Sequence, residues 1–110
     1  MPELSKVSFN APTKNVDGSA VVAGEITSYV VFIDTVNPPL KSYTVPAAEA
    51  APVSGVVTAT FAQLGFTPVV GTQYYAGAEA VAGGGPSSIS NIVSFLYTSA
   101  PDAPTGFTIS

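Results

Sequence analysis

Glycine and proline interrupt this chain so often that no long regular element fits between them. The 110 residues contain ten of each, and β-branched or aromatic residues fill most of the short stretches that they separate. No segment keeps the periodicity of a capped amphipathic helix. The pattern therefore predicts an all-β chain made of short strands.

The expected strands are bounded by turn residues. Residues 26–34 (ITSYVVFID) form the longest and most apolar stretch, which is typical of a central strand. Further strands are predicted at the stretches 4–10, 42–45, 56–61, 73–81 and 89–97. We expect turns or loops at 13–18 and 83–86, and a loop at 47–52, because prolines flank that Ala-rich segment.

Composition excludes several kinds of partner. Hydrophobic residues make up 46% of the chain and charged residues 9%, so a single domain fills its core and leaves uncharged surface that suits a protein contact. The net charge is −4, with three lysines and no arginine. Because binding to phosphates or anionic lipids needs clustered cations, we expect no nucleic-acid and no membrane partner. The N-terminal sequence also lacks the charged lead and apolar stretch of a signal peptide.

The residue types that most often carry catalysis are missing. The chain has no histidine and no cysteine, which removes the usual nucleophile–base pairs and most transition-metal sites. Asp17 and Asn15 share an oxygen-rich loop, but that loop lacks the acid count of a calcium site, so a turn is expected there. The other candidate acids lie singly in loops or on strands: Glu25, Asp34, Glu49, Glu79 and Asp102. We expect no enzymatic activity, no cofactor and no metal.

A tyrosine-centred motif near the C-terminal third points to a family. Residues 71–81 (GTQYYAGAEAV) resemble the F strand of fibronectin type III domains, which reads roughly G-T-x-Y-x-x-x-V-x-A-V. In that family the tyrosine forms a structural corner: its ring packs in the core and its hydroxyl binds the backbone where the chain crosses between sheets. Tyr74 matches this tyrosine, and Leu64 matches the leucine of the crossover.

The resemblance extends over most of the chain. Residues 15–18 and 26–31 are similar to the start of strand C, and residues 7–12 to strand B, with Phe9 where a core tryptophan usually stands. Three hydroxyl residues fit strand G: Ser87, Ser90 and Thr98. The order of these matches implies a seven-strand-type sandwich of the immunoglobulin-like, fibronectin type III kind over residues 1–98.

The first strand of the family pattern is displaced. Nothing before Val7 resembles strand A, which reads P-x-A-P-x-x-L-x-V, whereas residues 100–110 (APDAPTGFTIS) do. We therefore expect an A-type strand at the C-terminus, in a tail formed by residues 99–110. Three arrangements stay open: the tail docks in its own domain, exchanges with a neighbouring copy, or begins a next repeat. The candidate contact residues of the tail are Ala103, Pro104, Phe107 and Ile109.

Two functions fit these features. The first is a non-catalytic structural protein of a virion, similar to the capsid decoration or cement proteins of tailed phages. Its partner is a repeating lattice of capsid or other assembly subunits, or the chain itself as a homo-oligomer formed by strand exchange. The alternative is an adhesion or carbohydrate-binding accessory module of a bacterial secreted protein, at the cell surface or outside the cell. Tyr75 is expected on the outer face, available to either kind of partner, because neighbouring side chains on a strand point to opposite sides.

Overall fold

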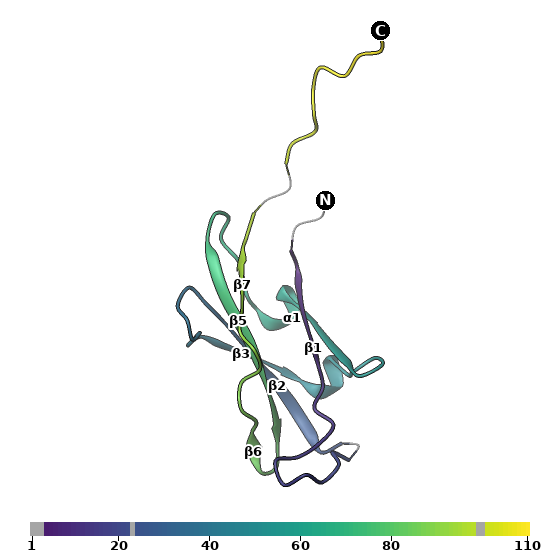
Figure 1. Cartoon of the computed structure of the whole chain (residues 1–110), viewed down its shortest axis with the longest axis vertical. Helices are drawn as coiled ribbons and strands as arrows, with labels where there is room; N and C mark the ends of the chain where they lie inside the picture. The colour runs from purple at the N-terminus through teal and green to yellow at the C-terminus, as the bar shows by residue number, and fades with distance from the viewer. Residues whose placement is uncertain (1–3, 23, 99–100) are drawn as a thin grey trace.

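The computed structural model describes residues 4–22, 24–98 and 101–110. Two antiparallel sheets pack face to face as a β-sandwich, which confirms the predicted all-β class (Figure 1). The smaller sheet consists of β1 (Lys6–Asn10) and β4 (Val56–Thr60), with Phe9 opposite Val57 in the register. The sandwich therefore has one layer of only two strands among the described residues.

The larger sheet is built around two long strands. β2 (Ile26–Asp34) lies between β3 (Ser42–Pro46) and β5 (Gln73–Ala82). β6 (Gly85–Pro86) and β7 (Val93–Leu96) both pair with β5 and continue the sheet on its other side. The central strand is the one that the sequence predicted, with the same bounds.

The core lies between the sheets and is centred on alternate residues of β2. Tyr29, Val31 and Ile33 are at most 2% exposed, and they face Val57 and Ala59 of β4, which are fully buried. Burying one such side chain stabilises a fold by about 1.5–3 kcal/mol. The alternate residues of β2 thus supply the contact between the two layers.

The strand predicted at 56–61 ends one residue earlier than expected. Thr60 instead caps a short helix, α1 (Phe61–Leu64), whose two buried residues are its first and last. The Thr60 hydroxyl accepts a hydrogen bond from the Gln63 N–H at 3.0 Å, and the Gln63 side-chain oxygen accepts one from the Thr60 N–H at 2.9 Å. This capping box satisfies two donors that a helix start leaves open. The predicted loop at 47–52 also differs, since Ala47–Glu49 form a 3₁₀ turn.

The last strand is shorter than the predicted 89–97. Before β7, two serine side chains bond to β5: the Ala80 N–H donates to the Ser87 hydroxyl at 3.0 Å, and the Ala78 N–H donates to the Ser90 hydroxyl at 2.9 Å. The N–H groups of the same serines donate to the carbonyls of Ala80 and Ala78, both at 2.8 Å. Because the hydroxyls take positions that ladder carbonyls would hold, this segment follows β5 without being a regular strand.

Tyr74 holds the crossover that leads from α1 into β5. Its side chain is 6% exposed, and its hydroxyl accepts a hydrogen bond from the Val69 N–H at 2.9 Å. Its ring packs edge-on against Phe66, with ring centroids 5.2 Å apart, and lies tilted against Phe95, with centroids 5.5 Å apart. Leu64 is buried just before the crossover. The crossover is thus tied to the core by one tyrosine through both its ring and its hydroxyl.

Replacing Tyr74 by phenylalanine is expected to lower the free energy of unfolding by about 1 kcal/mol, because the Val69 N–H loses its acceptor while the ring packing stays. Urea denaturation followed by circular dichroism measures the change. Tyr75→Phe is the matched control at the neighbouring position on the opposite face, and it is expected to leave stability unchanged. Equal losses in the two variants would contradict the assigned role.

Candidate functional site

β1 forms one edge of the smaller sheet, and its hydrogen bonds to β4 follow a fixed alternation. Just before β1, the Phe61 N–H donates to the Ser5 carbonyl at 2.8 Å; just after it, the Ala11 N–H donates to the Gly55 carbonyl at 2.8 Å. In an antiparallel ladder only every second pair of opposite residues exchanges such bonds. The odd-numbered residues of β1 therefore direct their backbone groups toward β4.

The even-numbered residues of β1 direct their backbone groups the other way. The N–H and C=O groups of Lys6, Ser8 and Asn10 lie along a side of β1 on which the described residues place no neighbouring strand. A row of such groups is a template for pairing with another strand. We call this side of β1 the open edge.

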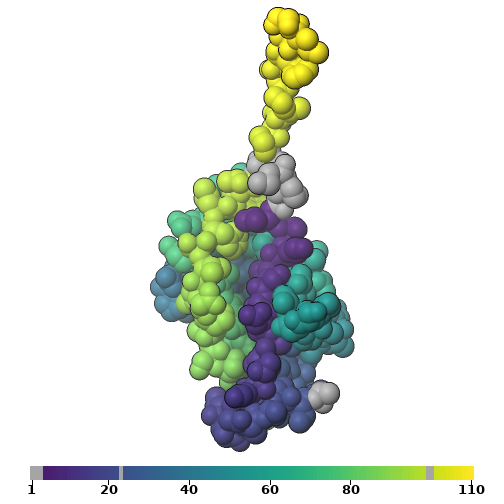
Figure 2. Space-filling view, turned by 45° about the vertical axis from the view of Figure 1, so that its right-hand side comes forward, coloured from purple at the N-terminus to yellow at the C-terminus, as the bar shows by residue number. Residues whose placement is uncertain are grey.

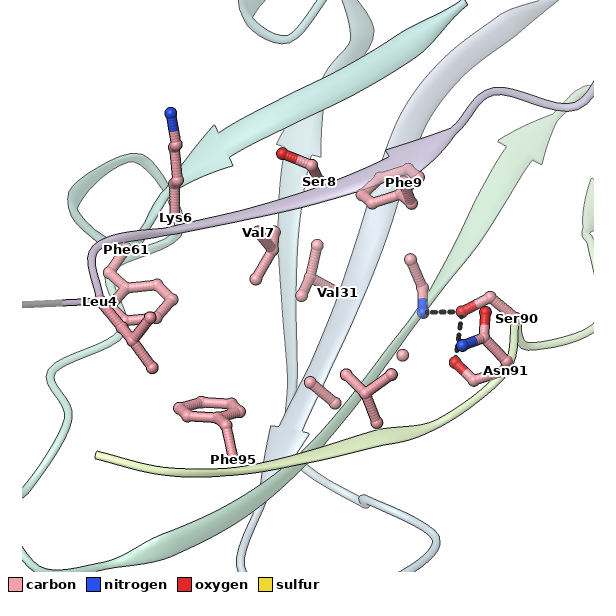
Figure 3. A pocket seen from close by; sticks show the side chains of 14 residues that line it. Leu4, Lys6, Val7, Ser8, Phe9, Val31, Phe61, Ser90, Asn91 and Phe95 are labelled. Atoms are coloured by element: carbon pink, nitrogen blue, oxygen red, sulfur yellow. Dashed lines mark hydrogen bonds between the residues drawn. The ribbon is translucent and has the colours of Figure 1, made fainter. Parts of the chain in front are cut away.

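An apolar groove runs beside the open edge, between β1 and β7 (Figures 2 and 3). Its volume is about 290 Å³. Val7 and Phe9 line it from β1, and Val93 and Phe95 from β7, while Lys6 points away from it (Figure 3). The groove therefore opens the core between the two sheets at the side where β1 has no neighbour.

Exposure on β7 shows how incompletely the groove is covered. Val93 lies opposite Ala76 in the register, and Phe95 lies opposite Tyr74, so both point to the core side of the sheet. Ala76 is 6% exposed, yet Val93 is 53% exposed. Leu4, at the other wall, is 51% exposed. An inward-facing valine that is half exposed leaves apolar surface open at the groove.

The tail predicted to carry the A-type strand lies outside both sheets. Residues 101–110 form no strand and are all exposed, and Phe107 and Ile109 are 90% and 91% exposed. Figures 1 and 2 show the tail projecting past the end of the domain where β1 begins and β7 ends. The tail is therefore not docked as a strand in its own domain here, and Ala103 and Pro104 are likewise exposed. Residues 99–100 of the predicted tail lie outside the described residues.

Tyr75 lies on the face of the larger sheet that points away from the core. It pairs with Asp34 across β5 and β2 and with Ser94 of β7. Its side chain is on the face opposite Tyr74 but is half-buried, so it offers less surface than the sequence suggested. The structure brings Tyr74 and Leu64 together in the core, and it does not bring Tyr75 to the groove or the tail.

The carboxylate of Asp17 serves its own loop. Its Oδ1 atom accepts hydrogen bonds from the Ser19 hydroxyl at 2.6 Å and the Ser19 N–H at 2.9 Å, and these bonds hold the pKa of Asp17 below its ordinary value. The Asn15 amide donates to Ser19 and Glu25. The loop is thus closed by internal hydrogen bonds, as the turn prediction expected.

Asp34 plays a similar part in the connection between β2 and β3. Its carboxylate accepts from the Thr35 N–H at 2.8 Å and from the N–H groups of Leu40 and Lys41, each at 3.2 Å. The pKa of Asp34 is lowered, chiefly by the Thr35 bond. Across residues 4–22, 24–98 and 101–110, no three acidic, histidine or cysteine side chains group as metal ligands. No helix in the same ranges is long and apolar enough to cross a membrane.

The two lowered pKa values predict that stability falls in acid. A carboxyl group whose pKa is lower in the folded than in the unfolded chain stabilises the fold above its unfolded value of about 3.8 and loses that effect as the pH falls through the folded value. We expect the urea concentration at the midpoint of unfolding to fall as the pH is lowered below about 4. Asp17→Asn combined with Asp34→Asn should flatten this acid limb, and an unchanged slope would contradict the assignment.

The arrangement of the two sheets is the basis for assigning the fold of this chain. The strand pairing and the shared core are those of a two-layer antiparallel β-sandwich, and they are compatible with an immunoglobulin-like one. Comparison with protein-family models gives no match, and comparison with curated proteins gives none either. The open edge, the groove and the exposed tail are therefore the features from which function is inferred.

Proposed function

We propose that this chain is a non-catalytic, fibronectin type III-like structural module that joins a repeating protein assembly through the open edge of β1. The observation that carries the proposal is the row of unpaired backbone groups on Lys6, Ser8 and Asn10 beside an apolar groove. An added strand binds such an edge by main-chain hydrogen bonds, and the groove receives its alternate side chains. The natural ligand of this site is therefore a polypeptide.

The family assignment is supported by the connectivity. β1 and β4 correspond to strands B and E of the type III pattern, and β3, β2, β5 and β7 to strands C′, C, F and G. The hydrogen bond from Val69 to Tyr74 is that of a tyrosine corner. In this correspondence, the open edge of β1 is the side on which strand A lies in the family.

The kind of assembly follows from the surface. Charged residues make up only 9% of the chain, so a partner covers its surface at little cost in desolvated charge. A capsid of a tailed phage is a lattice that presents many identical docking positions to such a module. We place the chain on the virion, as a decoration or cement protein whose partners are the shell subunits and further copies of the chain.

The carbohydrate-binding alternative has less support. A sugar platform needs aromatic rings with exposed faces, and Tyr75 is half-buried. Among the described residues, Phe107 is the one exposed aromatic residue, and it lies in the tail. A panel of polysaccharides probed with the wild-type chain and with Tyr75→Ala separates the two functions. We expect no binding by either chain.

Quantitative mass spectrometry of purified particles tests the virion assignment. Phage particles prepared from a strain that carries the coding sequence are expected to contain the chain in a number comparable to that of the shell subunit, because a decoration protein follows the lattice. Antibody labelling in the electron microscope should then mark the head. Particles that form normally without any copies of the chain would overturn the proposal.

A further inference from the structure

We propose that residues 106–110 of one copy pair antiparallel with β1 of the next copy, so that the chain links to itself head to tail. The inference rests on the proposed function, since it names the occupant of the same open edge. It makes the exposed tail the donor strand and the groove between β1 and β7 its acceptor.

The tail has the side-chain pattern that the groove requires. In an extended chain Phe107 and Ile109 share one face, and Thr108 and Ser110 share the other. Both apolar side chains are at least 90% exposed in the structure. Moving them into a groove walled by Phe9 and Val93 would remove apolar surface from water on both partners.

The polarity of the open edge, together with the apolar pattern of the tail, favours one register. Because Ser8 directs its N–H and C=O outward, it forms a hydrogen-bonded pair with Thr108, and this places Phe107 opposite Phe9. Ile109 then lies opposite Val7, on the groove side. On the outer face, Thr108 extends a row in which the hydroxyls of Ser8 and Thr58 already lie 3.3 Å apart. The register thus matches apolar with apolar and hydroxyl with hydroxyl.

Strand direction explains why the donor is another copy. At one end of the groove, Leu4 just before β1 lies near Phe95 of β7 (Figure 3). At the other end, Phe9 of β1 lies near Asn91, which precedes β7. β1 and β7 therefore run in opposite directions, and a strand antiparallel to β1 runs as β7 does. The tail leaves β7 at the end where such a strand would finish, not where it would start (Figure 1).

Docking in its own domain would also require a connection that turns back. To pair antiparallel in its own domain, the chain would first travel back along β1, which is about 17 Å for a five-residue strand. Residues 97–105 lead from β7 to the paired segment and span at most roughly 30 Å when fully extended. The return along β1 would use more than half of that length, and the connection would also have to reverse its direction twice. Pro101 and Pro104 also favour an extended connection that carries the tail away.

The resulting interface is heterologous. Each copy donates its C-terminal tail and accepts the tail of another copy along the open edge of β1. The tail enters the next copy in the same direction in which it leaves its own domain. Contacts of this type build open chains, or rings if the rotation between copies closes. The mass of the assembly is therefore expected to rise with concentration.

Light scattering and sedimentation of the full chain and matched variants test the inference. The donor variant Phe107→Ser with Ile109→Ser, and the acceptor variant Ser8→Pro, are each expected to remain at the mass of one chain, 11.1 kDa. Proline removes the outward N–H of Ser8 without touching a bond to β4. The controls Thr108→Ala and Ser8→Ala keep the backbone donors, and they should assemble as the wild type does.

Mixing the two variants is the decisive measurement. The donor variant still has an intact edge and the acceptor variant an intact tail, so the mixture should form a dimer and stop there. Val93→Glu is a second acceptor variant, and it changes a half-exposed side chain of the groove. A synthetic peptide of residues 101–110 should bind the donor variant and shorten wild-type assemblies.

Three results would overturn the inference. A wild-type chain that stays monomeric, with residues 106–110 protected from hydrogen exchange, would place the tail in its own groove. A monomer with an unprotected tail that does not bind the peptide would remove the groove as an acceptor. Association that survives the donor variant would assign it to another surface. None of these results bears on whether phage particles contain the chain, so the proposed function is tested separately.

Discussion

The structure depends on the burial of one face of β2 against the two-stranded sheet. Tyr29, Val31 and Ile33 supply that face, and Val57 and Ala59 meet it from β4. Ladders to β3 and β5 pair the backbone of β2 on both sides over residues 28–32. A two-stranded sheet is marginal by itself in water, and this contact is what allows β1 and β4 to persist.

The same constraint leaves the molecule incomplete at one side. β4 anchors β1 through the core, but the larger sheet reaches past it to β7, and the space between β1 and β7 lies open as a groove. Natural sheets usually cover or blunt an edge of this kind. Here inward-facing Val93 stays half exposed, while a tail with exposed Phe107 and Ile109 extends from the same chain. The features complement one another, and the proposed assembly follows from that.

The elements whose signal is a simple alternation were predictable from the sequence. Residues 26–34 form β2 with the predicted bounds, and Tyr74 and Tyr75 take opposite faces of β5 because strands have a period of two. The helix α1 was not predicted, and β7 was predicted too long, because side chains compete for backbone hydrogen bonds in both places. The T-x-x-Q pattern at Thr60 was a readable signal for the helix. The serine bonds to β5 depend on contacts across the sheet, which no local pattern carries.

The sequence by itself determined the all-β class, the central strand and the lack of histidine and cysteine chemistry, because residue type and local periodicity decide these. It also placed an A-like pattern at residues 100–110. Only the tertiary structure decided that the backbone groups of Lys6, Ser8 and Asn10 face an open side, and that a groove lies beside them. Strand neighbours and strand direction arise from pairing between distant segments, and the open edge exists only once that pairing is made.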